Sequence, residues 1–186
     1  MSFRYATLIA AVAAVSGLLF GFDTAVINGA LIFLRQELGL STRETEVATS
    51  SLLVGCAIGA AFAGWLTDRL GRKRSITIMT ASQGVMMLLF FWMGGTPALL
   101  FLGATIIGFN FGGNFALFPT ATADFFGPTH LGQNYGWVFT AYGVGGIVGP
   151  IMAGIFRDNG SWLPAFLISG VLEAFAAFKS ERWSGT

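Results

Sequence analysis

Ionisable and metal-binding residues are scarce in this chain of 186 residues. Asp, Glu, Lys and Arg make up 10% of it, and it has one cysteine, Cys56, and one histidine, His130. A lone cysteine forms no internal disulfide, and one histidine without neighbouring thiols predicts no metal site. The net charge of +1 gives no basic footprint for nucleic acid. No catalytic residues stand at a familiar spacing, so we expect neither an enzyme nor a cofactor.

Apolar residues, in contrast, make up 54% of the chain, and the mean hydropathy is +0.72. A helix needs about 20 uncharged residues to cross a bilayer, whereas barrel strands are about ten residues long and alternate in polarity. The chain has six long apolar blocks, at 6–34, 47–67, 76–93, 98–123, 136–156 and 162–178. We therefore predict an all-α integral membrane protein, a single domain over residues 1–186 with six transmembrane helices.

The basic residues between the blocks predict the orientation in the membrane. Lys and Arg accumulate in the short loops on the cytoplasmic side. With the N-terminus inside, the cytoplasmic set is Arg4, Arg69, Arg72, Lys73, Arg74, Lys179 and Arg182, against Arg35, Arg43 and Arg157 outside. We expect both termini to be cytoplasmic, in a bacterial inner (plasma) membrane.

The loop between the second and third blocks, within GWLTDRLGRKR at 64–74, combines an acid and glycines with a basic cluster. It fits the spacing G-x-x-x-D-R-x-G-R-K-R with Gly64, Asp68, Arg69, Gly71, Arg72, Lys73 and Arg74. Topology anchoring alone would explain its cations. The whole pattern, however, resembles the signature loop of the major facilitator superfamily. That resemblance implies that the loop latches helix ends across two halves of a transporter, with Asp68 in a latch that forms in one state and breaks in the other.

Two branches of this superfamily are resembled in different parts of the chain. Residues 17–74, which begin GLLFGFDTAVINGAL, resemble the first two helices of sugar porters. Residues 68–178, which include NYGWVFTAYGVGGIVGPIMAGIFRD, resemble the last four helices of oxalate/formate antiporter-type proteins. The chain therefore looks chimeric, sugar-porter-like over 1–74 and antiporter-like over 75–186.

The superfamily resemblance also implies an architecture. Its members usually have twelve helices in two halves, and each half contains two inverted three-helix repeats. The resemblance thus implies one such half. A short internal match supports the repeat, because AGWLTD at 63–68 and AGIFRD at 153–158 close equivalent helices.

Asp23 is the candidate for proton coupling. A carboxylate at membrane depth is costly when ionised, so its protonation can be linked to a conformational change. Proton-coupled sugar porters place an acid in the same GFD context, and the resemblance implies the same role here. The alternative is a structural role, in which Asp23 caps a helix or lines an outer vestibule.

Neutral polar residues within the blocks are the candidates for the substrate path. They are Asn28, Gln83, Asn110, Asn114, Thr140 and Tyr142. Asn110 and Asn114 are one helical turn apart and should face the same way. Such side chains serve either as interhelical hydrogen bonds or as ligand contacts. The acid of the last block, Glu173, is expected to extend toward the cytoplasmic surface.

Glycine spacing predicts where helices pack and bend. Close packing in lipid relies on small residues that let backbones approach. The G-x-x-x-G spacing occurs at Gly17/Gly21, Gly55/Gly59, Gly108/Gly112 and Gly145/Gly149. The stretch YGVGGIVGP at 142–150 predicts a hinge, because proline removes a backbone donor within a glycine-rich turn. Its residues are Gly145, Gly146, Gly149 and Pro150.

The resemblance makes secondary active transport of a small solute the leading function, with proton coupling as a further hypothesis. A single six-helix bundle has no second half to move against, so we expect a homodimer or a larger membrane complex. The alternative is a non-transporting membrane fragment, or an accessory subunit that uses its helices as an interaction surface.

Overall fold

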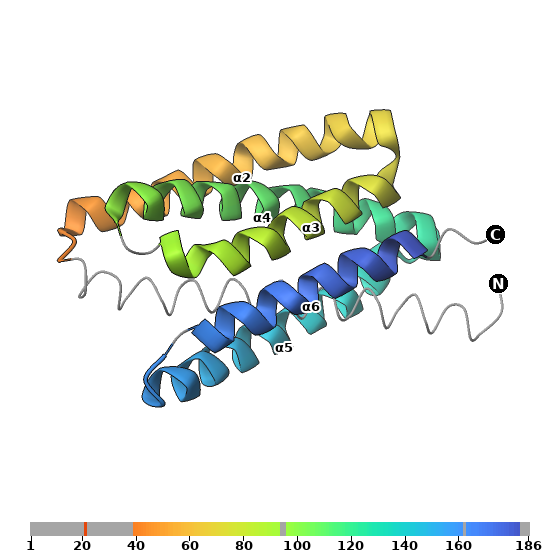
Figure 1. The fold of residues 1–186 in the computed structure, drawn as a ribbon. Coiled ribbons are helices and arrows are strands. Elements are labelled where there is room, and N and C mark those ends of the chain that lie inside the picture. The colour runs from red at the N-terminus through yellow and green to blue at the C-terminus, as the bar shows by residue number, and fades with distance from the viewer. Residues whose placement is uncertain (1–20, 22–38, 94–95, 162, 183–186) are drawn as a thin grey trace.

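The computed structural model describes residues 21, 39–93, 96–161 and 163–182. Within these residues all regular structure is helical, as predicted (Figure 1). The helices are α2 (Thr42–Leu70), α3 (Arg72–Met93), α4 (Pro97–Phe126), α5 (Leu131–Asp158) and α6 (Leu163–Arg182). Each matches one predicted apolar block, with ends that differ by a few residues. Apart from Gly21, which is helical, the first block lies outside the described residues.

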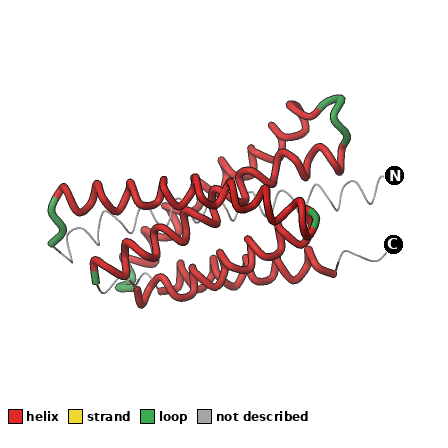
Figure 2. The backbone as a smooth tube through the Cα atoms, turned by 90° about the horizontal axis from the view of Figure 1, so that it is seen from above, coloured by secondary structure: helices red, strands yellow, loops and turns green. Residues whose placement is uncertain are grey.

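The length and composition of three of these helices are those of membrane spans. Among the described residues, α2, α4 and α5 are long and apolar enough to cross a bilayer, and Leu163–Phe178 of α6 is a shorter apolar stretch. The helices lie lengthwise beside one another with their loops at the two ends of the bundle (Figure 2).

Local sequence signals set the ends of α2. The Ser41 side chain accepts a hydrogen bond from the Glu44 backbone, and Glu44 accepts one from the Ser41 backbone, which completes a capping box. At the other end Gly71 has a φ of +79°. With a ψ of 158°, this backbone conformation is open almost only to glycine and costs another residue about 1–3 kcal/mol. The second glycine of the signature loop therefore makes the tight turn from α2 into α3.

Glycines bring the backbones of α2 and α4 into direct contact. A Cβ atom added to Gly59 would lie 2.6 Å from the carbonyl carbon of Phe109, and one added to Gly112 would lie 2.6 Å from that of Cys56. Gly55 and Gly108 meet the opposite backbone in the same way. The α2–α4 interface is the most extensive in the described structure. The predicted packing faces of these two helices are therefore confirmed.

Two further helix pairs are also joined through glycine. A Cβ on Gly84 of α3 would lie 3.0 Å from the Gly170 carbonyl oxygen of α6, and one on Gly170 would lie 2.9 Å from that of Gly84. A Cβ on Gly21 would lie 2.8 Å from the backbone nitrogen of Gly146 in α5. Close backbone contacts at glycine residues therefore join several pairs of helices in the bundle.

The outer surface of the bundle is unusually apolar. Trp137 of α5 is 72% exposed and Leu53 of α2 is 64% exposed, and many other large apolar side chains also face outward. A soluble monomer rarely exposes so much continuous apolar surface. The interior, in contrast, contains buried polar side chains as well as apolar ones. This distribution suits a protein surrounded by lipid.

Candidate functional site

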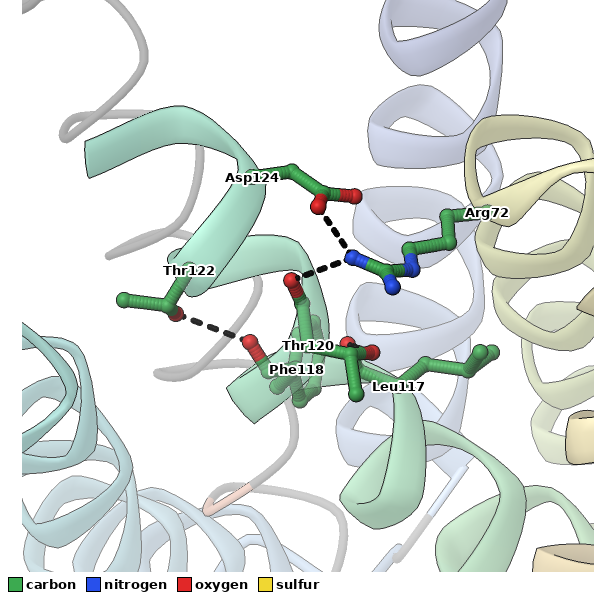
Figure 3. A network of polar contacts seen from close by, with 6 residues as sticks. All are labelled: Arg72, Leu117, Phe118, Thr120, Thr122 and Asp124. Carbon is green, nitrogen blue, oxygen red and sulfur yellow. Dashed lines mark hydrogen bonds and ion pairs between the residues drawn. The ribbon is translucent and has the colours of Figure 1, made fainter. Parts of the chain in front are cut away.

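The signature loop is fastened to α4 by Arg72, the first residue of α3. One guanidinium nitrogen, Nη1, donates a hydrogen bond to the Thr120 carbonyl oxygen at 2.9 Å and forms an ion pair with the Asp124 carboxylate (Figure 3). The two charged side chains are 38% and 53% exposed. A cation suits the last turns of a helix, where the carbonyl groups and the helix dipole are negative.

Asp124 belongs to this candidate site and was not among the residues predicted from the sequence. It is the only charged residue of α4 and lies one position beyond the predicted apolar block at 98–123. A lone acid at the end of an otherwise uncharged helix is a detectable signal. Its partner, however, lies 52 positions earlier in the chain, and only the fold brings the two together.

Three other residues of the signature loop, Gly64, Asp68 and Arg69, lie on α2. The guanidinium carbon of Arg69 lies 4.7 Å from the centroid of the Trp65 ring, a cation–π contact. Gly64 and Asp68 are exposed and one turn apart, so they share a face of α2. A Cβ on Gly64 would meet nothing within 4 Å. Among the described residues, Asp68 forms no ion pair.

The last two loop residues differ in exposure. Lys73 is half-buried, whereas Arg74 is exposed. Arg72 thus ties the loop to α4, and Gly64 and Asp68 form a separate exposed face on α2.

The neutral polar candidates do not form a single cluster. Gln83, Asn110 and Asn114 are buried inside the bundle. Thr140 is exposed, and its hydroxyl donates to the Trp137 carbonyl oxygen within the same helix at 2.6 Å. Tyr142 is half-buried and stacks on Phe139 with ring centroids 5.0 Å apart. Asp23 and Asn28 lie outside the described residues.

The expectation that Glu173 extends toward the surface is wrong. Its side chain is 2% exposed, and its Cβ lies 3.2 Å from the position that a Cβ on Gly84 would occupy. Because Gly84 has no side chain, α6 approaches α3 closely and places the acid in the interior. The prediction used only the short sequence distance between Glu173 and Lys179, and that distance does not reveal the contact of Glu173 with Gly84.

The predicted hinge lies within a continuous helix. Gly145 and Gly149 are buried, Gly146 is half-buried and Pro150 is exposed. Helix α5 runs through Pro150 from Leu131 to Asp158. The hinge role stays a prediction.

Together, the apolar helices and the signature loop define a helical membrane protein of the type suggested by the sequence. A profile of the Major Facilitator Superfamily matches residues 13–180, and the chain belongs to this superfamily.

Curated relatives come from both branches resembled by the sequence. The chain is 34% identical over 117 residues to the glucose transporter GlcP of Staphylococcus epidermidis, covering 63% of this chain and 26% of that protein. It is 30% identical over 118 residues to the oxalate:formate antiporter of Oxalobacter formigenes, covering 63% and 28%. The resemblance to both branches is confirmed. These relatives are transporters and not enzymes, as expected for this chain.

Solved structures share the fold. The proton:xylose symporter XylE bound to 6-bromo-6-deoxy-D-glucose superposes with a TM-score of 0.83 at 22% identity, covering 98% of this chain and 45% of that one. An inward-open form of XylE from E. coli gives a TM-score of 0.84, with 98% and 48% coverage. The chain thus spans about a quarter of the length of these two curated relatives and about half of these structures.

Proposed function

We propose that the chain is one half of a secondary active transporter for a small neutral solute. In this proposal the first block, 6–34, completes six transmembrane helices. Both termini face the cytoplasm of a bacterial inner membrane. The translocation path lies between this unit and a second copy of it, or a larger partner. Family membership and the match to about half of each solved transporter support the proposal.

Helix packing supports the arrangement as two inverted three-helix repeats. In such a pair, helices one, two and three are equivalent to four, five and six. Exchanging the repeats replaces α2 by α5 and α4 by the first helix, so the α2–α4 contact should have an equivalent between α5 and the first helix. The same exchange turns the α3–α6 contact into itself. Gly21 against Gly146 and Gly84 against Gly170 fit this scheme.

The observation that carries the proposal is the division of the signature loop into two parts. Arg72 is held within the unit by Asp124, whereas Gly64 and Asp68 present an exposed face on α2. A glycine lets another backbone approach, and a carboxylate can pair with a cation or a helix N-terminus. Exposed ion pairs contribute only about 0–1 kcal/mol, so a latch of this kind can open and close during transport.

The charge of the helices favours a neutral solute. Residues 98–123 and 136–156 contain no Lys or Arg to bind an anion. Asn28, Asn110, Asn114, Gln83, Thr140 and Tyr142 stay proposed contacts of the solute, and Asp23 stays the proposed proton-coupling acid. We expect no oxalate exchange, although one relative is named as an oxalate:formate antiporter.

The test is uptake by liposomes containing the purified chain. Labelled glucose, xylose and arabinose would be supplied under an inward proton gradient, with protein-free liposomes as the blank. We expect uptake above the blank and loss of its pH dependence in Asp23→Asn. Asp68→Asn should reduce uptake, whereas the exposed control Glu46→Gln should not. Uptake whose pH dependence survives Asp23→Asn contradicts proton coupling through this residue, and measurable oxalate exchange contradicts the preference for neutral solutes.

A non-transporting role is the second candidate. It is favoured by the large apolar surface on α2 and α5. In that case the chain is an accessory subunit or fragment. Stable complexes in the membrane without uptake of any tested solute would support it over transport.

A further inference from the structure

An exposed stripe of α2 changes from apolar to aromatic to cationic along the helix. It consists of Val54, Ile58, Phe62, Trp65 and Arg69, and we call it the α2 stripe. Val54 and Ile58 are each 56% exposed and Trp65 is 49% exposed, and Arg69 is also exposed. Spacings of three and four residues place these side chains on one face of the helix. The α2 stripe therefore has an apolar end and a charged end.

The charged end of the α2 stripe is held by ring contacts. The guanidinium carbon of Arg69 lies 4.7 Å from the centroid of the Trp65 ring. The Trp65 and Phe62 ring centroids are 5.3 Å apart, and Phe62 lies 5.3 Å from Phe109 of α4. A chain of contacts that reaches a second helix thus orders the Arg69 side chain. Binding a ligand there requires less further ordering of the protein.

The stacking of Arg69 leaves its N–H groups for a ligand. The donors of a guanidinium lie in its plane and point outward from the edge, whereas a cation–π contact uses the face. Within the described part of the chain Arg69 forms no ion pair. Phosphate oxygens match this planar arrangement and accept two parallel hydrogen bonds from one arginine. The charged end of the α2 stripe therefore suits a phosphate group.

The charge around Arg69 also favours an anion. The turn from α2 into α3 lies at one end of the bundle (Figure 1). Residues 68–74 contain four cations and one acid, and Asp124 adds a second acid through its ion pair with Arg72, which leaves a net charge of +2. Asp68 precedes Arg69 directly but lies about 100° around α2. The acid and the α2 stripe are therefore on different faces of the helix.

The apolar part of the α2 stripe has the length of a lipid chain. Val54 and Trp65 are eleven positions apart, which corresponds to about 16 Å along a helix. One leaflet provides about 15 Å, half of a hydrocarbon core of about 30 Å. Tryptophan side chains settle at the boundary between hydrocarbon and headgroups. The α2 stripe thus places apolar contacts at the depth of an acyl chain and a cation at the depth of a headgroup.

This combination selects an anionic phospholipid. A free phosphate ion has no chain to cover Val54 and Ile58. A zwitterionic headgroup has a cation of its own beside the phosphate, which weakens its attraction to a turn with a net positive charge. An anionic lipid satisfies both ends of the α2 stripe.

We propose that the α2 stripe is a binding site for one anionic phospholipid. The Arg69 guanidinium binds the phosphate, Trp65 contacts the glycerol region, and Phe62, Ile58 and Val54 contact one acyl chain. This inference goes beyond the proposed transport function, since it concerns the outer surface of the bundle and can be measured without any solute.

The test is native mass spectrometry of the full chain in mild detergent, titrated with phosphatidylglycerol or with phosphatidylcholine that has the same acyl chains. We expect tighter binding of phosphatidylglycerol. Arg69→Gln should weaken it about fivefold, the contribution of one cation near an anionic surface, and should leave phosphatidylcholine binding unchanged. Trp65→Leu should also weaken phosphatidylglycerol binding, because it removes the ring that holds Arg69. The matched control is Arg43→Gln, which removes an exposed arginine at the opposite end of α2 and should change neither affinity.

The proposal is overturned by equal affinity for the two lipids, by unchanged phosphatidylglycerol binding in Arg69→Gln, or by an equal loss in Arg43→Gln. Competition by glycerol 3-phosphate as strong as by the lipid would assign the site to a soluble anion instead. Loss of lipid binding on formation of a dimer would assign the α2 stripe to a second copy of the chain. Circular dichroism establishes that each variant is folded. If Arg69→Gln does not fold, Trp65→Leu decides, and unchanged affinity there contradicts the site.

Discussion

The substitution Gly112→Ala tests the glycine contact between α2 and α4. The new Cβ would lie 2.6 Å from the carbonyl carbon of Cys56, about 1 Å inside an ordinary carbon–carbon contact. The obstacle is backbone, so the helices must move apart. Overpacking costs up to about 3 kcal/mol, and the better helix propensity of alanine offsets up to about 1 kcal/mol. We expect a net loss of about 2 kcal/mol.

That loss corresponds to a fall of about 4–8 °C in Tm for a chain of this size. The assay is thermal unfolding of the detergent-solubilised protein, followed by circular dichroism. Gly154→Ala is the matched control, because a Cβ there would meet nothing within 4 Å. It should leave Tm unchanged or raise it. Equal Tm values for Gly112→Ala and the unaltered protein would refute the close α2–α4 contact.

Three further predictions concern the loops around α2. Gly71→Ala should destabilise the fold by about 1–3 kcal/mol in thermal unfolding, because this residue has a φ of +79° and a ψ of 158°, a conformation open almost only to glycine. Ser41→Ala should cost about 1 kcal/mol in the same assay, because it removes the capping box with Glu44. A double-mutant cycle of Arg72→Gln with Asp124→Asn should give a coupling energy below about 1 kcal/mol, because both side chains are more than a third exposed.

Matched controls separate these effects from general damage. Gly132→Ala places a methyl group in open space within α5 and should not lower Tm. Arg74→Gln removes an exposed cation of the same loop and should show no coupling with Asp124→Asn. A Gly71→Ala protein as stable as the unaltered one would contradict the turn geometry. A coupling energy of several kcal/mol would contradict the assignment of the ion pair as exposed.

Much of the fold could be predicted because lipid imposes simple rules on a sequence. The uncharged blocks of bilayer length predicted α2 to α6. The helix ends differ from the block ends by a few residues, because backbone hydrogen bonding continues beyond the apolar residues until a cap or a glycine ends the helix. Gly55, Gly59, Gly108 and Gly112 were predicted as packing residues from their spacing alone. The spacing predicts which face of a helix packs closely, but it does not predict which other helix lies against that face. Only the structure shows that α2 and α4 pack on each other.

The site was less predictable, because contacts between distant helices decide it. Asp124 was missed since its importance depends on Arg72, which the chain brings to it only after folding. Glu173 was misplaced, because its burial depends on the missing side chain of Gly84. The loop motif itself was readable, since its glycine turn and charges are local. A motif thus located the candidate site, and packing determined which of its residues lie together.

The protein mass of the purified chain in a nanodisc tests the central claim most directly, namely that a second copy completes the translocation path. Multi-angle light scattering separates the mass of protein from that of lipid. The account predicts a dimer of about twice the chain mass of 19.7 kDa. A particle that contains one chain, with no uptake of solute, would contradict the claim that this chain builds a transport path with its own copy.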